Sequence, residues 1–198
     1  MPSIIDICNL ALDKIGAEGT LVSLDDKIKE ARLCKKHYDM SRASVLSQHP
    51  WKFAHTRVVI SPIVTAPVFG PTYQYTLPVD CLVVRMANDT DTVWTVEGRS
   101  LLCESSTVNL EYTANITDPN LFHPQFCDNL AYHLAQKICY ALTQSNEREN
   151  FLVGEVQRVA KAARFSDAVQ NSPTALIADL FDNVRIGPNR GYVRDPQT

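Results

Sequence analysis

Hydrophobic residues recur at every third or fourth position near both ends of the chain, and this spacing predicts amphipathic helices there. The first predicted helix covers about residues 4–17. Ser3 is its expected N-cap, and Asp6, three residues later, completes a capping-box pattern. The glycine at position 16 supplies a stop signal, because glycine readily adopts the left-handed conformation that ends helices.

A second, longer helix is predicted over about residues 25–48. Ser23 or Asp25 is the expected cap, since both residue types accept hydrogen bonds from the first free N–H groups of a helix. Pro50 ends the pattern, because proline disfavours helical geometry in the residue before it. The residues expected on the buried side are Ile28, Ala31, Cys34, Tyr38 and Val45.

Helical periodicity returns in the last third of the chain. An unbroken row of large apolar residues runs from Phe126 to Leu142 in steps of four, beside a second row of small residues. Together they form a stripe wide enough to face a helical core. A fourth helix is predicted over about residues 147–169, with Leu152, Val156, Val159 and Ala163 facing inward.

Between Thr56 and Thr113 the pattern changes to short runs of β-branched and aromatic residues, which predict strands. Proline, glycine, asparagine and aspartate separate these runs. The Glu97-Gly98-Arg99 segment predicts a tight hairpin turn between two of the strands. Three prolines predict that residues 61–71 form a loop, because proline cannot donate to a strand ladder.

These elements predict an α+β fold: a four-helix bundle with a small antiparallel β insert between helices 2 and 3, and an extended C-terminal arm. The arm is expected because the last segment combines glycine, proline and scattered charge with weak periodicity. The predicted divisions are 1–54 for the first half of the bundle, 55–115 for the β insert, 116–171 for the second half, and 172–198 for the arm.

Composition narrows the expected location and partners of the chain. Its 198 residues carry a net charge of -3, which does not favour strong binding of phosphate groups. The start of the chain lacks the basic segment of a signal peptide, and no apolar run reaches the ~18 residues of a membrane span. We therefore expect no membrane partner and interpret the six cysteines as reduced thiols of a cytosolic environment.

The sequence offers little that predicts catalysis or metal binding. Phosphate-loop, dinucleotide and hydrolase motifs are absent from it. Cys34 and His37 have the spacing of two zinc ligands, but a second such pair is missing. We expect no catalytic residue, no metal and no cofactor. An alternative hypothesis, that the chain is a hydrolase, would assign the catalytic role to carboxylates of the β insert, namely Glu97, Glu104 and Glu111.

The histidines and aromatic residues after the second helix predict a structural role. His49, Pro50, Trp51 and Phe53 are expected to form a joint, in which His49 caps helix carbonyls or packs against its neighbours, and the two aromatic residues anchor the helix to the β insert. Elsewhere, His55 is expected in a loop and His133 at an exposed or interfacial position.

Four groups of short sequence motifs, which follow one another along the chain, resemble the tail tubular protein A family, the head-to-tail adaptors (connectors) of short-tailed bacteriophages. The resemblance extends over about residues 5–170. The groups, in chain order, are Glu30-Ala31-Arg32-Leu33-Cys34 with Tyr38-Asp39, Arg42 and His49-Pro50-Trp51; Tyr73-x-Tyr75-x-Leu77-Pro78 with Asp80-Cys81-Leu82; Glu97-Gly98-Arg99-x-Leu101-Leu102; and Thr117-Asp118-Pro119 with Phe122, Pro124 and Phe126.

The resemblance implies a structural virion protein in the neck of the tail, assembled in the host cytoplasm. It implies a ring of about twelve copies that binds the portal protein, extends the DNA channel and presents a platform to a downstream tail tube or nozzle protein. Genomic DNA would pass through without specific binding. The residues expected to bind the portal are Phe181, Arg185, Arg190, Tyr192 and Arg194.

Two other functions remain open at this point. A tail-associated cell-wall hydrolase would use carboxylates of the β insert. A nucleic-acid-binding module would show affinity that falls steeply with salt concentration. The C-terminal arm also has an alternative, that of a solvated tail that contacts no partner.

Overall fold

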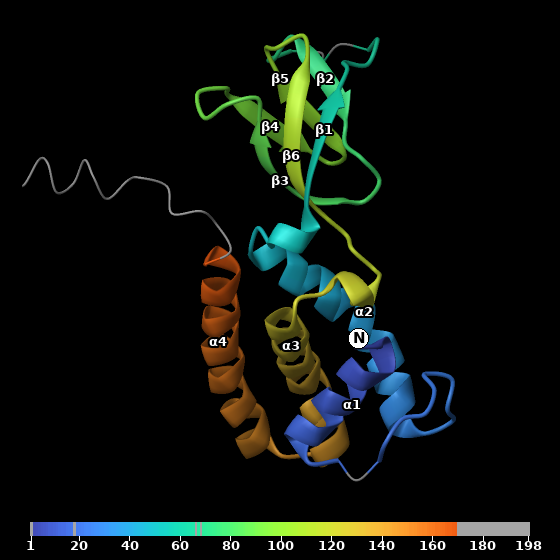
Figure 1. Cartoon of the computed structure of the whole chain (residues 1–198). Helices are drawn as coiled ribbons and strands as arrows, with labels where there is room; N and C mark the ends of the chain where they lie inside the picture. Colours follow the sequence, from blue (N-terminus) through green and yellow to red (C-terminus); the bar gives the residue numbers. More distant parts are fainter. Residues whose placement is uncertain (1, 18, 66, 68, 170–198) are drawn as a thin grey trace, which may run out of the picture. The chain divides into compact units, whose positions relative to one another are not determined.

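The computed structural model describes residues 2–17, 19–65, 67 and 69–169 (Figure 1). In these residues it contains four α-helices, two short 3-10 helices and six strands in two antiparallel sheets, so the fold is mixed α+β. The portion up to Asp167 forms one compact unit. No helix in the described residues is long and apolar enough to cross a membrane.

Helix α1 spans Ile4–Ile15 and has the capping box that the sequence predicts. The Asp6 N–H donates to Ser3 Oγ at 3.1 Å, and the Ser3 N–H donates to the Asp6 carboxylate at 2.8 Å. Gly16 ends the helix at φ +67°, a left-handed conformation that favours glycine. Both predicted ends of this helix are therefore confirmed to within two residues.

Helix α2 spans Lys29–Gln48 and begins four residues later than predicted. The Asp26 carboxylate accepts hydrogen bonds from the N–H groups of Val22 and Ser23, and these bonds fold the preceding residues into a turn. The actual N-cap, Ile28, makes no side-chain cap bond and is exposed. The predicted cap and the predicted burial of Ile28 are both wrong.

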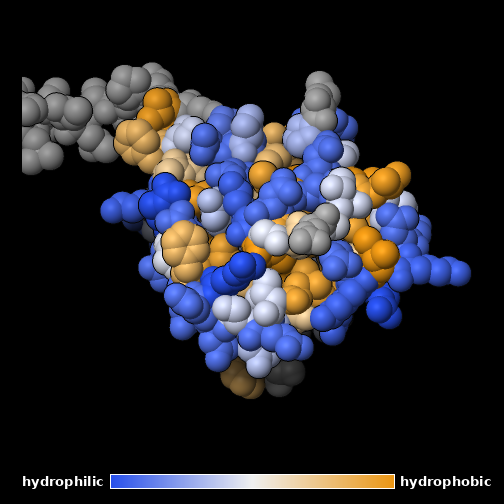
Figure 2. All heavy atoms as spheres, turned by 90° about the horizontal axis from the view of Figure 1, so that it is seen from below, coloured by the Kyte–Doolittle hydropathy of each residue, from blue (hydrophilic) through white to orange (hydrophobic). Residues whose placement is uncertain are grey.

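Helices α3 (Pro124–Thr143) and α4 (Asn146–Ala168) follow the sheets in the chain. Both α1 and α2 pack along α3, whose two predicted apolar rows are buried except for Leu142 at the end. The four predicted inward residues of α4 are also buried. Seen from below, hydrophilic side chains cover most of the surface around the helices (Figure 2).

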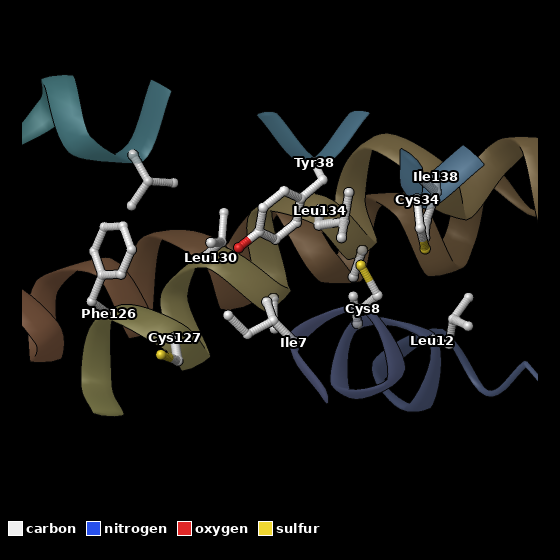
Figure 3. Close-up of a cluster of buried hydrophobic side chains, with 14 of the residues drawn as sticks. Ile7, Cys8, Leu12, Cys34, Tyr38, Phe126, Cys127, Leu130, Leu134 and Ile138 are labelled. Atoms are coloured by element: carbon white, nitrogen blue, oxygen red, sulfur yellow. The ribbon is translucent and has the colours of Figure 1, made fainter. Parts of the chain in front are cut away.

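All four helices contribute side chains to one hydrophobic core (Figure 3). Cys8 of α1, Cys34 of α2 and Leu134 of α3 are fully buried in it. Leu152 of α4 belongs to the same core. The helical core is therefore built from segments that lie on both sides of the β region in the sequence.

The six strands form two antiparallel sheets with the orders β1-β6-β3 and β2-β5-β4. Their bounds are β1 His55–Ile60, β2 Tyr73–Thr76, β3 Cys81–Ala87, β4 Trp94–Glu97, β5 Ser100–Cys103 and β6 Val108–Ala114. The predicted hairpin is confirmed: Glu97 pairs with Ser100, and Gly98 turns the chain at φ +59°. The described residues between 61 and 71 form no helix or strand, as predicted.

The two sheets share a second hydrophobic core, separate from that of the helices. Alternate residues of β6, such as Leu110 and Tyr112, enter it from one sheet, and Tyr75 and Leu101 enter it from the other. Arg99, in the β4–β5 turn, donates to the Cys81 carbonyl at 3.0 Å and so ties the sheets together. The β region therefore has its own core.

Candidate functional site: the junction after helix α2

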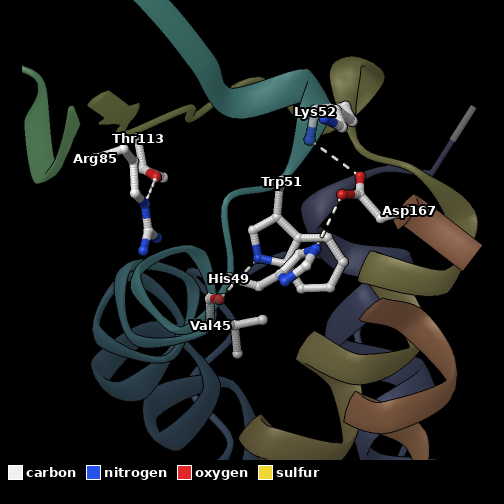
Figure 4. Close-up of polar contacts among 7 residues, drawn as sticks. All are labelled: Val45, His49, Trp51, Lys52, Arg85, Thr113 and Asp167. Carbon is white, nitrogen blue, oxygen red and sulfur yellow. Dashed lines mark hydrogen bonds and ion pairs between the residues drawn. The ribbon is translucent and has the colours of Figure 1, made fainter. Parts of the chain in front are cut away.

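The end of helix α2 is held by a tryptophan that follows it in the chain (Figure 4). His49 leaves the helix in an extended conformation, and Pro50 and Trp51 lead into the 3-10 helix η1, Lys52–Ala54. Trp51 is 1% exposed, and its Nε1–H donates to the Val45 carbonyl at 2.9 Å. That carbonyl is one of the last four of the helix, which lack partners within it. The indole therefore caps the helix.

Aromatic contacts bind the same segment to helix α3. The Trp51 and Phe126 rings meet edge to face with centroids 5.1 Å apart. Phe53 contacts Phe126 at 4.9 Å and Phe122 at 5.7 Å. Such pairs each stabilise by about 0.5–1.5 kcal/mol beyond the area they bury. Trp51 and Phe53 thus lie in the helical core, and not in the core of the sheets.

His49 contacts the last turn of helix α4. Its Nε2 lies 3.0 Å from Asp167 Oδ2, and its ring packs edge-on against Trp51 at 4.8 Å. The other carboxylate oxygen of Asp167 accepts the Lys52 N–H at 3.0 Å. Of the two roles expected for His49, capping of helix carbonyls or packing, the structure shows packing against Trp51, together with a contact to a carboxylate.

Asp167 is the residue of this junction that the sequence analysis missed. It is 3% exposed, although a carboxylate in the last turn of a helix faces the unfavourable negative end of the helix dipole. Contacts with His49 and Lys52 offset that cost. The sequence did contain a pattern that predicts the burial of Asp167. This residue follows Ala163 by four positions and so continues the inward-facing row of α4.

Arg85 joins helix α2 to the first sheet. The pairing of β3 with β6 is irregular between Val84 and Met86, and Arg85 lies at this irregularity. Its Nε–H donates to Thr113 Oγ1 at 2.8 Å, and its Nη2 donates to the Ser47 carbonyl at 3.0 Å. Burial lowers the pKa of the Arg85 guanidinium from its usual value. A second free carbonyl at the end of α2 is satisfied in this way.

No two of the three carboxylates that the hydrolase hypothesis names lie close enough to act as a catalytic pair. Glu97 pairs with Ser100 at the turn end of the β4–β5 ladder, and Glu104 follows the other end of β5, about 13 Å along the strand from Ser100. Glu111 lies in the other sheet, 2.8 Å from Arg57 Nε and 3.1 Å from His55 Nε2. His55 is the first residue of β1 and not, as we expected, a loop residue.

The two residues with zinc-like spacing have different surroundings. Cys34 is fully buried beside Cys8, whereas His37 is half-buried. Burial, Lys36 and Lys137 lower the pKa of His37. In the described part of the chain, no group of three or more histidine, cysteine, aspartate or glutamate side chains is placed to hold a metal ion. All six cysteines are buried as free thiols, and burial raises the pKa of Cys127 to about 11.

His133, which we expected at an exposed or interfacial position, is half-buried. Its Nε2 is buried and has no hydrogen-bond partner among the described residues. Burial, with the nearby charges of Lys137 and Arg164, lowers the pKa of His133. The imidazole is therefore uncharged near neutral pH.

The five residues expected to bind a portal lie outside the described residues: Phe181, Arg185, Arg190, Tyr192 and Arg194. No protein-family model matches the chain, and no curated protein matches it either. The clearest arrangement of polar side chains is thus the junction itself, where helices α2 and α4 and the first sheet meet.

Proposed function

We propose that the chain is a structural virion protein, a head-to-tail adaptor that forms a ring under the portal. The ring extends the DNA channel and offers a platform to the next tail component. The observation that carries this proposal is the junction after helix α2, which joins a helical core and a sheet core through buried contacts. A ring subunit must transmit position between neighbouring copies, and a firm joint suits that task.

The proposal includes a finer architecture. The four helices act as one bundle, the paired sheets are an insert between α2 and α3, and the residues after 171 are an arm that reaches the portal. Support comes from the helical core, which draws on both sides of the insert in the sequence. Two parts with separate cores offer the distinct surfaces that head-to-tail ring contacts require.

The overall charge agrees with a conduit for DNA. A net charge of -3 gives no general attraction for phosphate groups, so genomic DNA slides past without being held. The arrangement of the three β-region carboxylates gives no support to the alternative hydrolase function, since Glu104 and Glu111 are engaged by Thr72, Arg57 and His55.

The proposal is tested by the native mass of a portal ring from the same virion, measured by mass photometry with and without the chain. A gain of about 265 kDa is expected, which is twelve copies of the 22.1 kDa chain. A portal ring of unchanged mass beside a free 22.1 kDa chain would contradict the proposal. A variant that lacks residues 174–198 tests the arm, and portal binding at full strength without these residues would remove the arm from the contact.

A further inference from the structure

Two phenylalanines lie exposed on the outer face of helix α4. Phe151 is 66% exposed and Phe165 is 73% exposed. They are fourteen positions apart, so they point within about 40° of one another and lie about 21 Å apart along the helix. Arg158, midway between them, is exposed on the same face. We call these three residues the α4 stripe.

The stripe has the residue types that protein interfaces favour. Phenylalanine and arginine are both enriched at interface cores, and arginine is also enriched among the residues whose loss weakens binding strongly. Toward its C-terminal end the stripe is flanked by two further exposed cations, Lys161 and Arg164. The surface around Phe165 is therefore both apolar and basic.

A complementary surface lies at the start of helix α1. A shallow hollow of about 460 Å³ is lined by Ile4, Ile5, Leu24 and Pro119, with Asn120 at its edge. Pockets of about 300–1,000 Å³ accommodate drug-sized ligands, so the hollow has room for an aromatic side chain. Pro119 belongs to η2, Pro119–Leu121, and we call this feature the α1–η2 hollow.

Three aspartates are hydrogen-bonded to residues that line the hollow or to the turn beside it. Asp6 is hydrogen-bonded to Ser3, and Asp118 is hydrogen-bonded to Asn120, both of which line it. Asp26 accepts hydrogen bonds from the turn that contains Leu24. The charge of this surface is thus opposite to the cations around Phe165, and such complementarity selects partners and orients them.

The stripe and the hollow lie on different sides of the helical core. Figure 1 shows α4 on one side of α3, and the start of α1 with η2 on the other. A knob on one side and a matching hollow on the other cannot pair within one chain. Between copies they make a head-to-tail contact, which generates a ring if the rotation closes.

We infer that the α4 stripe of one copy packs across the α1–η2 hollow of the next copy, with Phe165 entering the hollow. The inference rests on the proposed ring and names the two surfaces by which its neighbours meet. Helix α4 is about 35 Å long, and a strip about 10 Å wide covers about 350 Å², less than half of the ~800 Å² that each partner of a standard interface buries. A single contact is therefore weak, and ring closure strengthens it.

The test uses two full-length variants that each disable one surface. The stripe variant carries Phe151→Ala and Phe165→Ala, and the hollow variant carries Asn120→Arg. The matched control is Phe69→Ala, which removes a phenylalanine that is 88% exposed in the β region. Thermal melting followed by circular dichroism checks that all variants are folded, which is expected because these side chains are exposed.

Self-association is measured by sedimentation velocity and by native mass on the portal ring. Each variant alone is expected to associate about tenfold or more weakly than wild type, and the control to behave as wild type. An equal mixture of the two variants is expected to form dimers that grow no further, because each mixed pair retains one intact stripe facing one intact hollow.

The outcomes separate this inference from the proposed function. A stripe variant that assembles on the portal as wild type does would overturn the pairing and leave the adaptor function intact. Wild type that self-associates through the stripe yet adds no mass to the portal would leave the pairing intact and overturn the adaptor function. A mixture that forms no dimers, at a concentration at which wild type already populates dimers held by one contact, also overturns the pairing. Wild type that stays monomeric with and without the portal overturns it too.

Discussion

At the scale of single residues, Trp51 combines two stabilising roles that are usually separate. Its ring fills the helical core against Phe126, and its Nε1–H satisfies the Val45 carbonyl at the end of its own preceding helix. Burial of a large ring normally conflicts with the hydrogen-bonding need of its N–H group. Here the turn at Pro50 brings the indole back over the helix end, so both needs are met at once.

Trp51→Ala is expected to lower the free energy of unfolding by roughly 3–5 kcal/mol, because it removes a fully buried ring and leaves a cavity. Trp51→Phe keeps most of the ring but leaves the carbonyl unpaired, so a smaller loss of about 1–3 kcal/mol is expected. Urea denaturation followed by fluorescence measures both. Trp94, partly buried in the other core, provides the control as Trp94→Ala. Equal losses at the two tryptophans would contradict the role assigned to Trp51.

His133 makes stability depend on pH. Its folded pKa is lowered from the ordinary value of 6.5, so the folded state binds a proton less readily than the unfolded state. As the pH falls below about 6.5, the unfolded chain gains protons that the folded chain does not, and the free energy of unfolding decreases. Above that pH the residue is neutral in both states and contributes no pH dependence.

The melting temperature of the wild-type chain is therefore expected to fall between about pH 7.5 and about pH 5.5. His133→Gln removes the titrating group and should make this fall smaller. Part of the fall should remain, because the pKa of His37 is lowered too. Circular dichroism melting curves of both proteins at the two pH values provide the measurement. An identical fall in the variant would show that His133 does not carry the effect.

At the scale of elements, the last turn of α4 depends on partners that are distant in the chain. Asp167 accepts the Lys52 N–H and contacts His49, both more than one hundred positions earlier. A helix end with a buried carboxylate is unfavourable on local grounds. Tertiary contacts therefore stabilise the buried Asp167 carboxylate. Removal of the carboxylate should destabilise the junction, because both contacts are lost.

Asp167→Ala is expected to lower the free energy of unfolding by about 1–3 kcal/mol, because it leaves the Lys52 N–H, whose hydrogen bond is partly buried, without an acceptor. Asp167→Asn keeps an acceptor oxygen and should lose less. Chemical denaturation measures both changes. Asp13→Ala, at an exposed aspartate in α1, should change stability by no more than about 0.5 kcal/mol. A loss at Asp167 no larger than at Asp13 would mean that the carboxylate has no structural role.

The same elements show which features the sequence could predict. The capping box of Ser3 and Asp6 was predictable because both partners lie within one turn. The start of α2 was not, because Ser23 and Asp25 have the residue types of a helix cap, whereas Asp26 folds this segment into a turn, and sequence pattern does not decide between a cap and a turn. The contacts of Arg85 could not be predicted for another reason. The direction in which its side chain points depends on an irregular strand register, which is visible only in the paired sheet.

At the scale of the molecule, the sequence predicted the order of helices and strands but not how the strands divide. Six short runs are compatible with one sheet or with two, and the hydrophobic pattern of each run is similar in both cases. The division into two sheets follows from which faces share a core, and these contacts are non-local. The portal-binding residues Phe181 and Arg185, with Arg190, Tyr192 and Arg194, stay predictions.

The pairing of β1 with β6 has a consequence for the entropy of the helical core. His55 pairs with Thr113, so the chain leaves and re-enters the helical part at adjacent points, about 5 Å apart. The connection between α2 and α3 is 75 residues long (49–123), but once the sheets are formed only 16 residues, 49–54 and 114–123, still separate the helices from the His55–Thr113 pair. Loop-closure entropy grows with the logarithm of length, so the folded sheets lower the free-energy cost of bringing α2 and α3 together by roughly 1.4 kcal/mol. Folding of the β region therefore brings the two halves of the helical core together. The strands of the β region themselves contribute few side chains to that core.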